Sequence, residues 1–249
     1  MFNYIKVIIL NTIFIFSINL YISAAEIIID DDKISEGTYV YDPYEGINRA
    51  VLSFNMAIDD IAIQPAISTY KVITPDIAEK GISNFFYNLK EPLKTITFLL
   101  QGDLKNSMNS MGRFIVNTTT TLGLYDTSKH LGLKKNNSDM GIVLGKAGIN
   151  SGPYLVIPII GPTNFRDLTG KVLDLSINPI SLMSTGSSVN YTIGSAFSVR
   201  AEYDKELKDL KSNSNDLYNS LKLIYHQRRM GDINNDYLKD LPVPKIYID

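Results

Sequence analysis

Apolar residues recur along most of the chain with the spacing of amphipathic helices. The first series follows a turn at residues 41–46 and predicts a helix over residues 47–63, which we expect Pro65 to interrupt. The members of this series are Ile47, Val51, Phe54 and Ile58. Their spacing of i, i+4, i+7 and i+11 places them on one face, so the segment is predicted to be an amphipathic helix.

Three more helical segments are expected before residue 121. Thr74 and Pro75 supply a cap and a first-turn proline for a helix that we expect to end near Pro92. The helical period then continues as far as Gly102, and Asp103 caps the next helix. The apolar stripe of this helix is Leu104, Met108, Met111 and Ile115. Because methionine stripes more often pack into cores than bind ligands, we predict that this stripe is buried.

Residues 152–167 depart from helical spacing. Prolines at positions 153, 158 and 162 hold the apolar run 155–160 between rigid turns, so the run is expected to be extended rather than helical. Thr163 is predicted to cap a following helix. The apolar face of that helix is Phe165, Leu168, Val172 and Leu175. Two interpretations stay open for the run: a buried strand or core-crossing loop, or an apolar surface offered to a ligand or a membrane.

Three glycines precede this stretch, after Asp139, which is predicted to cap a short element. Gly141, Gly145 and Gly148 do not form a dinucleotide-binding fingerprint, and no P-loop Lys-Ser/Thr follows them, so nucleotide binding is not expected. Three glycines in eight residues indicate close backbone approach or unusual φ. We therefore predict a hinge or a tight crossing beside residues 152–167.

The C-terminal third is expected to hold two helices after a serine-rich loop at residues 181–188. A long helix follows from Val189 to Leu210, with its far half solvated. A last helix starts at residues 214–216 and ends at Gly231, where His226 and two arginines are interpreted as a charge cluster at a helix end. Residues 232–249 are predicted to be a loose tail.

The N-terminus has the pattern of an export signal. Lys6 precedes a mostly apolar run, and small residues lead to a predicted cleavage after Ala25. An uncleaved membrane anchor is the competing interpretation, because the run approaches the ~20 residues of a membrane span. Residues 1–25 are thus predicted to be a signal peptide and residues 26–41 a flexible leader. Residues 42–231 are then predicted to form one helical domain.

Composition and charge exclude several classes of function. The 249 residues carry 24 basic and 26 acidic side chains, and this near balance gives no electrostatic case for nucleic acid. The chain contains no cysteine, which excludes disulfides, thiolate metal sites and a Cys-linked lipid anchor. Its two histidines are far apart, and no motif of a hydrolase or metalloprotease is present. We expect no catalytic residue, no metal and no cofactor.

Six ordered blocks resemble the MlaA (VacJ) family, in register from residue 42 to residue 234. The blocks are residues 42–49 (DPYEGINR), 83–85 (SNF) with 88–92 (NLKEP), 100–103 (LQGD), 113–118 (RFIVNT), 152–154 (GPY) with Pro158, 161–162 (GP) and 166–167 (RD), and 225–228 (YHQR). The resemblance implies an all-α protein: a ring-like single domain around an amphipathic channel, lying in the inner leaflet of the outer membrane.

The same resemblance implies a function without catalysis. Proteins of this kind remove misplaced phospholipid from the outer leaflet and pass it to a soluble periplasmic carrier of the Mla type, often together with trimeric porins. The family commonly carries a lipid on a cysteine, whereas this chain has none, so we expect it not to be lipidated. The alternative is a soluble periplasmic protein that binds an apolar ligand or serves as a scaffold.

A lipid path is predicted within residues 152–167, where an apolar wall for acyl chains adjoins polar partners for head groups. The predicted path consists of Tyr154, Leu155, Ile157, Ile159, Asn164, Arg166 and Asp167. Gly141, Gly145 and Gly148 would let the neighbouring backbone pack closely or act as a hinge.

Overall fold

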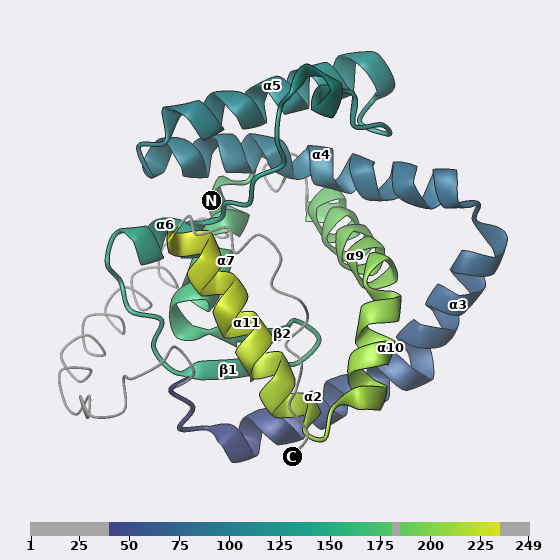
Figure 1. The fold of residues 1–249 in the computed structure, drawn as a ribbon, viewed down its shortest axis with the longest axis vertical. Helices are drawn as coiled ribbons and strands as arrows, with labels where there is room; N and C mark the ends of the chain where they lie inside the picture. Colours follow the sequence, from purple (N-terminus) through teal and green to yellow (C-terminus); the bar gives the residue numbers. More distant parts are fainter. Residues whose placement is uncertain (1–39, 181–184, 235–249) are drawn as a thin grey trace. The chain divides into compact units, whose positions relative to one another are not determined.

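The computed structural model describes residues 40–180 and 185–234, and helices make up most of them (Figure 1). The predicted signal peptide and nearly all of the predicted leader lie outside the described residues, as do positions 235–249 of the predicted tail. The helices of the first half are α2 (Glu45–Ile58), the π-helix η2 (Asp59–Ile63), α3 (Gln64–Ile73), α4 (Asp76–Leu100), α5 (Leu104–Thr121) and the 3₁₀-helix η3 (Thr127–Leu131). The expectation of an all-α fold is confirmed.

The second half adds five helices and one β-hairpin within the described residues. Its elements are α6 (Met140–Lys146), β1 (Tyr154–Ile157), β2 (Gly161–Asn164), α7 (Phe165–Ile177), α9 (Thr185–Glu202), α10 (Asp204–Asn213) and α11 (Leu217–Asn234). No helix in the described ranges combines the length and the apolar character that crossing a bilayer requires.

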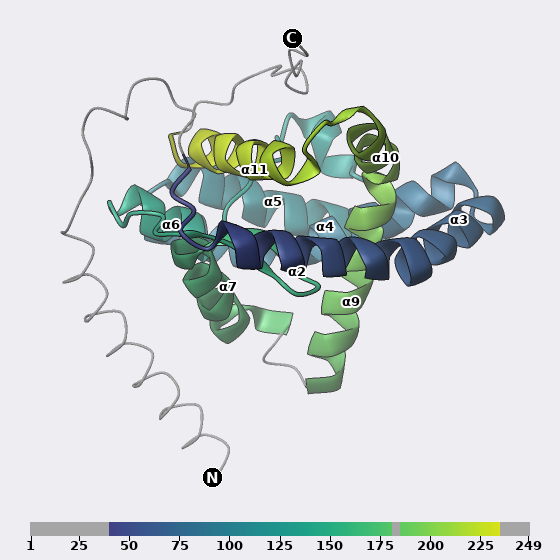
Figure 2. The ribbon, with the colours of Figure 1, turned by 90° about the horizontal axis from the view of Figure 1, so that it is seen from below.

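The helices pack in pairs that the chain order largely sets. Helices α4 and α5 are joined by a tight turn and lie side by side (Figure 1). Helix α6 packs on α7, and α9 packs on α4. Helix α11 returns against α6 and β2, while α2 packs on β1. Figure 2 shows α2 and α3 running on from one another almost in line, joined through η2. Pro65 does not interrupt this line: it lies in the first turn of α3, directly after the π-helical residues of η2.

Two of the predicted caps are confirmed and two are wrong. Thr74 does not cap α4: it ends α3, and the N-cap position of α4 is Pro75, without a side-chain hydrogen bond. Asp103 accepts from Asn106 N–H at 3.0 Å, and Asp139 accepts from Ile142 N–H at 2.9 Å. Helix α7, however, is capped by Asn164, whose side chain accepts from Asp167 N–H at 2.7 Å. Thr163, the predicted cap, lies in β2 instead, because the strand continues one residue further than the sequence suggested.

Pro92 does not end a helix either. It lies inside α4, which runs unbroken from Asp76 to Leu100. A proline in a helix interior leaves one carbonyl without its donor, so tertiary contacts must compensate for it. Here α5 packs along the same part of α4 and supplies those contacts.

The predicted extended run is a tight antiparallel hairpin. Tyr154 pairs with Asn164, and Ile157 pairs with Gly161. At the tip, Ile159 has a positive φ of 69°, a conformation that costs a β-branched residue energy. Tyr154 and Val156 are buried, whereas Ile159 is 80% exposed. The hairpin therefore directs one face into the protein and its tip into the surroundings.

Several helices bury their polar face and expose their apolar face. On α5 the predicted core stripe is outside, with Met108 67% and Met111 54% exposed, so that prediction is wrong. The buried residues of α5 are Ser107, Ser110, Arg113 and Asn117. The same inversion occurs on α7, which buries Arg166 and Asp167 and exposes part of its apolar side.

Ion pairs explain why the polar side of α5 faces inward. The Arg113 side chain, which is 2% exposed, lies with its Nε 3.2 Å from Glu91 Oε1 and its Nη2 3.0 Å from Asp126 Oδ2. Its Nη1 donates to the carbonyl of Leu133 at 2.8 Å. Burying these charges is tolerable only while they stay paired, so the α4–α5 contact depends on them.

We predict that removing this pairing costs far more stability than changing the exposed stripe. Arg113→Met leaves two carboxylates without their main cation and should lower the free energy of unfolding by roughly 3–5 kcal/mol. Met111→Gln, on the same helix, should change it by only about 0.5 kcal/mol. Denaturant unfolding followed by far-ultraviolet circular dichroism in a mild detergent measures both. Equal losses in the two variants would contradict the inverted packing.

Candidate functional site

A buried charge cluster joins α6, α7 and α11. The guanidinium of Arg229 lies between two carboxylates, with its Nη1 2.7 Å from Asp139 Oδ2 and its Nε 2.8 Å from Asp167 Oδ2. Arg166 Nε adds a contact of 3.0 Å to Asp167 Oδ1, and the hydroxyl of Tyr225 donates to the same carboxylate. The Arg229 guanidinium on α11 therefore ties the start of α6 to α7.

The electrostatics of this cluster keep Asp167 ionised. Burial alone would raise the pKa of Asp167, but the hydrogen bonds and charge of Arg229 outweigh it and hold the pKa below its ordinary value. Asn164 Nδ2 donates to Asp167 Oδ2 at 2.8 Å and further satisfies the carboxylate. Of the predicted lipid path, Asn164, Arg166 and Asp167 are thus brought together, in a cluster that ties helices to one another.

Two glycines allow α6 and α7 to cross next to this cluster. A Cβ added to Gly170 would lie 2.3 Å from Gly141 N, and a Cβ added to Gly141 would lie 2.5 Å from Arg229 Nη2. Only glycines leave room for backbones this close. The structure therefore places Gly141 at a tight crossing, one of the two expectations for the glycines. The hinge role of Gly141, Gly145 and Gly148 stays a prediction.

The apolar members of the predicted path lie on the hairpin, which two asparagines of α2 hold in place. Asn48 donates to Tyr154 O at 3.0 Å and accepts from Val156 N–H at 2.9 Å. Asn55 repeats this pattern with Ile157 O at 3.0 Å and Ile159 N–H at 2.8 Å. The two amides thus substitute for a third strand along β1.

The apolar path residues differ in burial, from the interior to the tip of the hairpin. Tyr154 is buried against Leu52 and Tyr218, whereas Leu155 and Ile157 are half-buried and Ile159 is exposed at the tip. A role of these side chains in guiding lipid stays a prediction.

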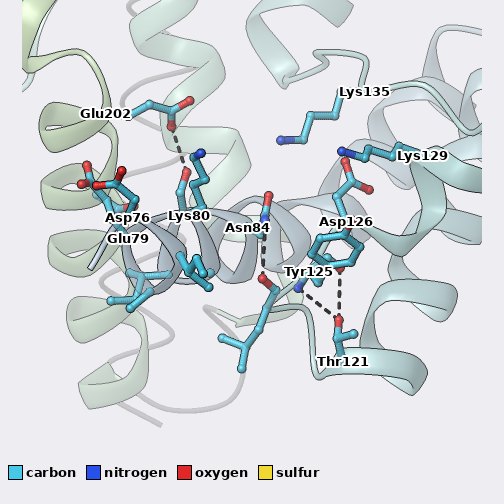
Figure 3. A pocket seen from close by; sticks show the side chains of 17 residues that line it. Asp76, Glu79, Lys80, Asn84, Thr121, Tyr125, Asp126, Lys129, Lys135 and Glu202 are labelled. Carbon is cyan, nitrogen blue, oxygen red and sulfur yellow. Dashed lines mark hydrogen bonds between the residues drawn. The ribbon is translucent and has the colours of Figure 1, made fainter. Parts of the chain in front are cut away.

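A separate pocket lies beside the N-terminal half of α4. It has a volume of 1330 Å³ and is lined from α4, from the segment after α5, and from the end of α9. Figure 3 shows acidic side chains of α4 and α9 at one side and Lys129 and Lys135 at the other, with Lys80 between them. Ile77 and Leu124 contribute apolar surface. A pocket with both charge signs and apolar walls suits an amphipathic ligand.

The sequence offered no local signal for the partners that complete these sites. Arg229 is one of the two arginines that the sequence places with His226 in a charge cluster at a helix end. That prediction is wrong for Arg229, because its guanidinium bridges Asp139 and Asp167, which lie 90 and 62 residues away in the sequence. The pocket lysines come from separate elements, and no motif connects them. Ion pairs between residues far apart in the chain have no regular spacing, so a single sequence does not predict them.

The two histidines and the acidic side chains of the described residues form no metal site. No group of three His, Asp or Glu side chains within residues 40–180 and 185–234 could hold a metal ion. His130 stacks on Tyr125 and shares a hydrogen bond of 3.0 Å between its Nε2 and the Tyr125 hydroxyl. Burial lowers the pKa of His226.

Asp174 is a half-buried carboxyl close to the Arg229 cluster. Burial, together with the nearby carboxylate of Asp139, raises its pKa to about 7. Its Oδ1 accepts from Met140 N–H at 3.0 Å, at the start of α6. Because the folded pKa exceeds the unfolded value, folding takes up a proton between about pH 4 and pH 7.

This shift predicts a stability that falls as pH rises from 4 to 7. Asp174→Asn keeps an acceptor for Met140 N–H but cannot ionise, so it should be more stable than the parent at pH 8, by up to roughly 4 kcal/mol, and similar at pH 4. Unfolding curves at both pH values measure the difference. Asp209→Asn, at an exposed carboxylate on α10, serves as the control for loss of a carboxylate charge. A constant difference at all pH values would refute the raised pKa.

Comparisons with known proteins agree on one family. The profile described as "MlaA lipoprotein" matches residues 40–231. An uncharacterized protein of Rickettsia prowazekii is 34% identical over 214 residues, 83% of each chain. The "Intermembrane phospholipid transport system lipoprotein MlaA" of Escherichia coli K12 is 30% identical over 203 residues, 80% of each chain.

A solved structure gives the same answer in three dimensions. It is described as "Structural basis for maintenance of bacterial outer membrane lipid asymmetry" and superposes with a TM-score of 0.70 at 29% identity. The superposition covers 78% of this chain and 99% of the other. With the helical fold and the matched profile, this agreement means that the chain belongs to the MlaA lipoprotein family.

Proposed function

We propose that this chain transports phospholipid between membranes, working without catalysis from the inner leaflet of the outer membrane. The observation that carries this proposal is the inverted amphipathicity of the helices. Apolar side chains face outward on α5 and α3, while charged and amide side chains are buried between helices. Large exposed apolar surfaces on a monomer mark sites of interaction with membranes or other proteins.

The chemistry of the outer surface fits lipid tails. Met108 and Met111 on α5 have counterparts in Val72 and Ile73 on α3, all well exposed. Each Å² of apolar surface removed from water contributes about 25 cal/mol, so immersion in hydrocarbon stabilises the protein. The described part of the chain holds no spanning helix, so the contact we propose lies within one leaflet.

Inside the domain, the proposed transport depends on polar side chains, in contrast to the apolar outer surface. Head groups cross a bilayer core only if polar side chains accompany them, because burying an unpaired charge costs several kcal/mol. We propose that helices of the domain surround an amphipathic channel in which misplaced phospholipid leaves the outer leaflet and reaches a soluble periplasmic carrier. A trimeric porin would stand beside it. The related protein of Escherichia coli is named for intermembrane phospholipid transport, which supports this assignment.

Anchoring forms a separate part of the proposal. The relatives are named lipoproteins, whereas none of the 249 residues is a cysteine that could carry a lipid. We propose that the exposed apolar faces hold the protein in the membrane after cleavage at Ala25, without acylation.

The test of function is a deletion strain. Loss of the gene should raise the phospholipid content of the outer leaflet, and the cloned chain should restore it, because transport from that leaflet would depend on this protein. Chemical labelling of surface phospholipid measures the effect. Fractionation on the same cells separates the alternative: recovery in the outer membrane after a salt wash fits our proposal, whereas release with the periplasmic contents favours a soluble binding protein. Unchanged outer-leaflet phospholipid would refute transport.

A charge on the hairpin tests the predicted lipid path. Ile157→Asp and Ile159→Lys place an ion where acyl chains are predicted to slide, at a cost of several kcal/mol if the site is desolvated, so transport should fail while the protein accumulates. Protein abundance, circular dichroism and outer-leaflet phospholipid content are measured together. Ser212→Lys, an exposed position on α10, is the control for added charge. Normal lipid asymmetry in both hairpin variants would remove the hairpin from the path, and loss of the folded protein would assign it to the core.

A further inference from the structure

The pocket beside α4 separates its charges by sign along the helix. Asp76 and Glu79 lie in the first turn of α4, whereas Lys135 Nζ lies 4.4 Å from the centre of the Tyr87 ring. The helix rises ~12–16 Å between these acids and Tyr87. Figure 3 shows the acids and the lysines at opposite sides of the pocket, with Lys80 between them. A small zwitterion is too short to reach both ends, so an occupant that pairs with both must be longer.

Both ends keep capacity for new ion pairs. Among the described residues, neither Lys129 nor Lys135 has a carboxylate oxygen within 4.0 Å of its Nζ, and Asp76 has no cationic nitrogen within that distance. Glu79 Oε1 is 3.8 Å from Lys71 Nζ, beyond hydrogen-bonding distance. The pocket therefore offers carboxylates at an acidic end (Asp76 and Glu79) and ammonium groups at a basic end (Lys129 and Lys135).

Two further acids of the pocket wall are held by other partners. Asp126 Oδ2 lies 3.0 Å from Arg113 Nη2, and Glu202 Oε2 accepts from the Ser83 hydroxyl at 2.9 Å. Neither carboxylate is in contact with a lysine of the basic end, so those lysines can still pair with an added acid.

Exposed apolar surface lies between the two ends. Asn84 Nδ2 is 3.4 Å from the carbonyl oxygen of Leu124, and a Cβ added to Gly81 would lie 3.6 Å from the same oxygen. Leu124 is thus beside the middle of this part of α4, and its side chain is 50% exposed. The volume of 1330 Å³ exceeds the ~1000 Å³ of large small-molecule pockets. These properties favour a polypeptide segment with an apolar centre and charged ends.

Residues 240–245 of this chain have that order of chemistry. The segment reads Asp-Leu-Pro-Val-Pro-Lys, with an acid and a base on either side of four apolar positions. Each proline fixes its own φ and biases the residue before it towards an extended backbone, so the segment favours polyproline II. At ~3.1 Å per residue, the five steps from Asp240 to Lys245 cover ~15 Å, the separation of the two charged ends of the pocket.

The segment is also within reach of the pocket, and its direction fits. The described part of α11 ends at Asn234, and two residues earlier the Asp232 carboxyl is hydrogen-bonded by Asn137, which follows Lys135 by two residues. The six residues that lead to Asp240 extend to ~20 Å, enough to bring its carboxylate to the basic end. The chain therefore arrives with its acid at the lysines. A tether this short raises the effective concentration of the segment to the order of millimolar.

We propose that residues 240–245 dock in this pocket as a polyproline II segment. Val243, three residues or ~9 Å beyond Asp240, then packs against Leu124. Lys80 donates to a backbone carbonyl of the segment, because polyproline II forms no internal hydrogen bonds. The inference does not depend on phospholipid transport. The ion pairs are Asp240 with Lys129 and Lys135, and Lys245 with Asp76 and Glu79.

Cysteine pairs test the contact, because none of the 249 residues is a cysteine. In the full chain in mild detergent, Val243→Cys with Leu124→Cys should form an intramolecular disulfide with oxidised glutathione. The rate should be at least tenfold that of Val243→Cys with Met111→Cys, an exposed position on α5 outside the pocket. Mass spectrometry of proteolytic peptides quantifies the link. Equal rates overturn the docking and leave the pocket to a different molecule. A covalent dimer linked at the same two positions overturns it in favour of the tail of a second copy.

Charge reversal tests the ion pairs in the same disulfide assay. Asp240→Lys should slow the link at least fivefold, because it places like charges together, and adding Lys135→Glu should restore it. Lys134→Glu, at an exposed neighbour outside the pocket, should not restore it. Circular dichroism checks that every variant is folded. An unchanged rate with Asp240→Lys, or equal rescue by the two glutamate variants, overturns the pairing at the basic end.

Discussion

Charges withdrawn from water and paired with one another hold the helices of this protein together. Arg113 joins α5 to Glu91 of α4, and Arg229 joins α11 to the carboxylates of Asp139 and Asp167. A buried ion pair adds little net stability compared with an apolar contact, but losing one partner is expensive. The pairs therefore fix which helix faces meet. Once the polar faces are committed to the interior, the apolar faces can only point outward, and that orientation creates the surface on which a membrane function can be built.

Hydrophobic spacing could predict the helices but not the direction in which they face. The series on α5 correctly predicts a helix after Asp103, whose cap the structure confirms. The same series predicts the wrong buried face for α5, because burial of the apolar side is a property of proteins surrounded by water. Periodicity says only that the two sides of a helix differ. In the lipid environment that we propose for this protein the apolar sides face the surroundings, and the spacing of Met108 and Met111 does not encode the surrounding medium.

Local chemistry could likewise predict only half of the charge cluster. The block that contains Arg166 and Asp167 stood out in the sequence, as did the glycine at 141, because prolines and glycines leave local signals. Arg229 leaves none, since it lies 62 residues from Asp167 and 90 from Asp139. The lysines of the pocket are scattered in the same way. Long-range pairing follows from the fold, and a single sequence does not report it.

The inverted packing also accounts for Gly141, one of the three glycines that the sequence pattern singles out, and for Gly170, which it does not. Short polar pairs such as Arg229 with Asp139 and Asp167 require the backbones of α6, α7 and α11 to lie close together. A Cβ on Gly170 would lie 2.3 Å from the backbone nitrogen of Gly141, so any side chain there would force α6 and α7 apart. Separating the helices would lengthen the hydrogen bonds to Arg229 and leave buried charges partly unpaired. The glycines and the paired charges therefore depend on each other, because the glycines set the helix spacing at which Arg229 can form its ion pairs with Asp139 and Asp167.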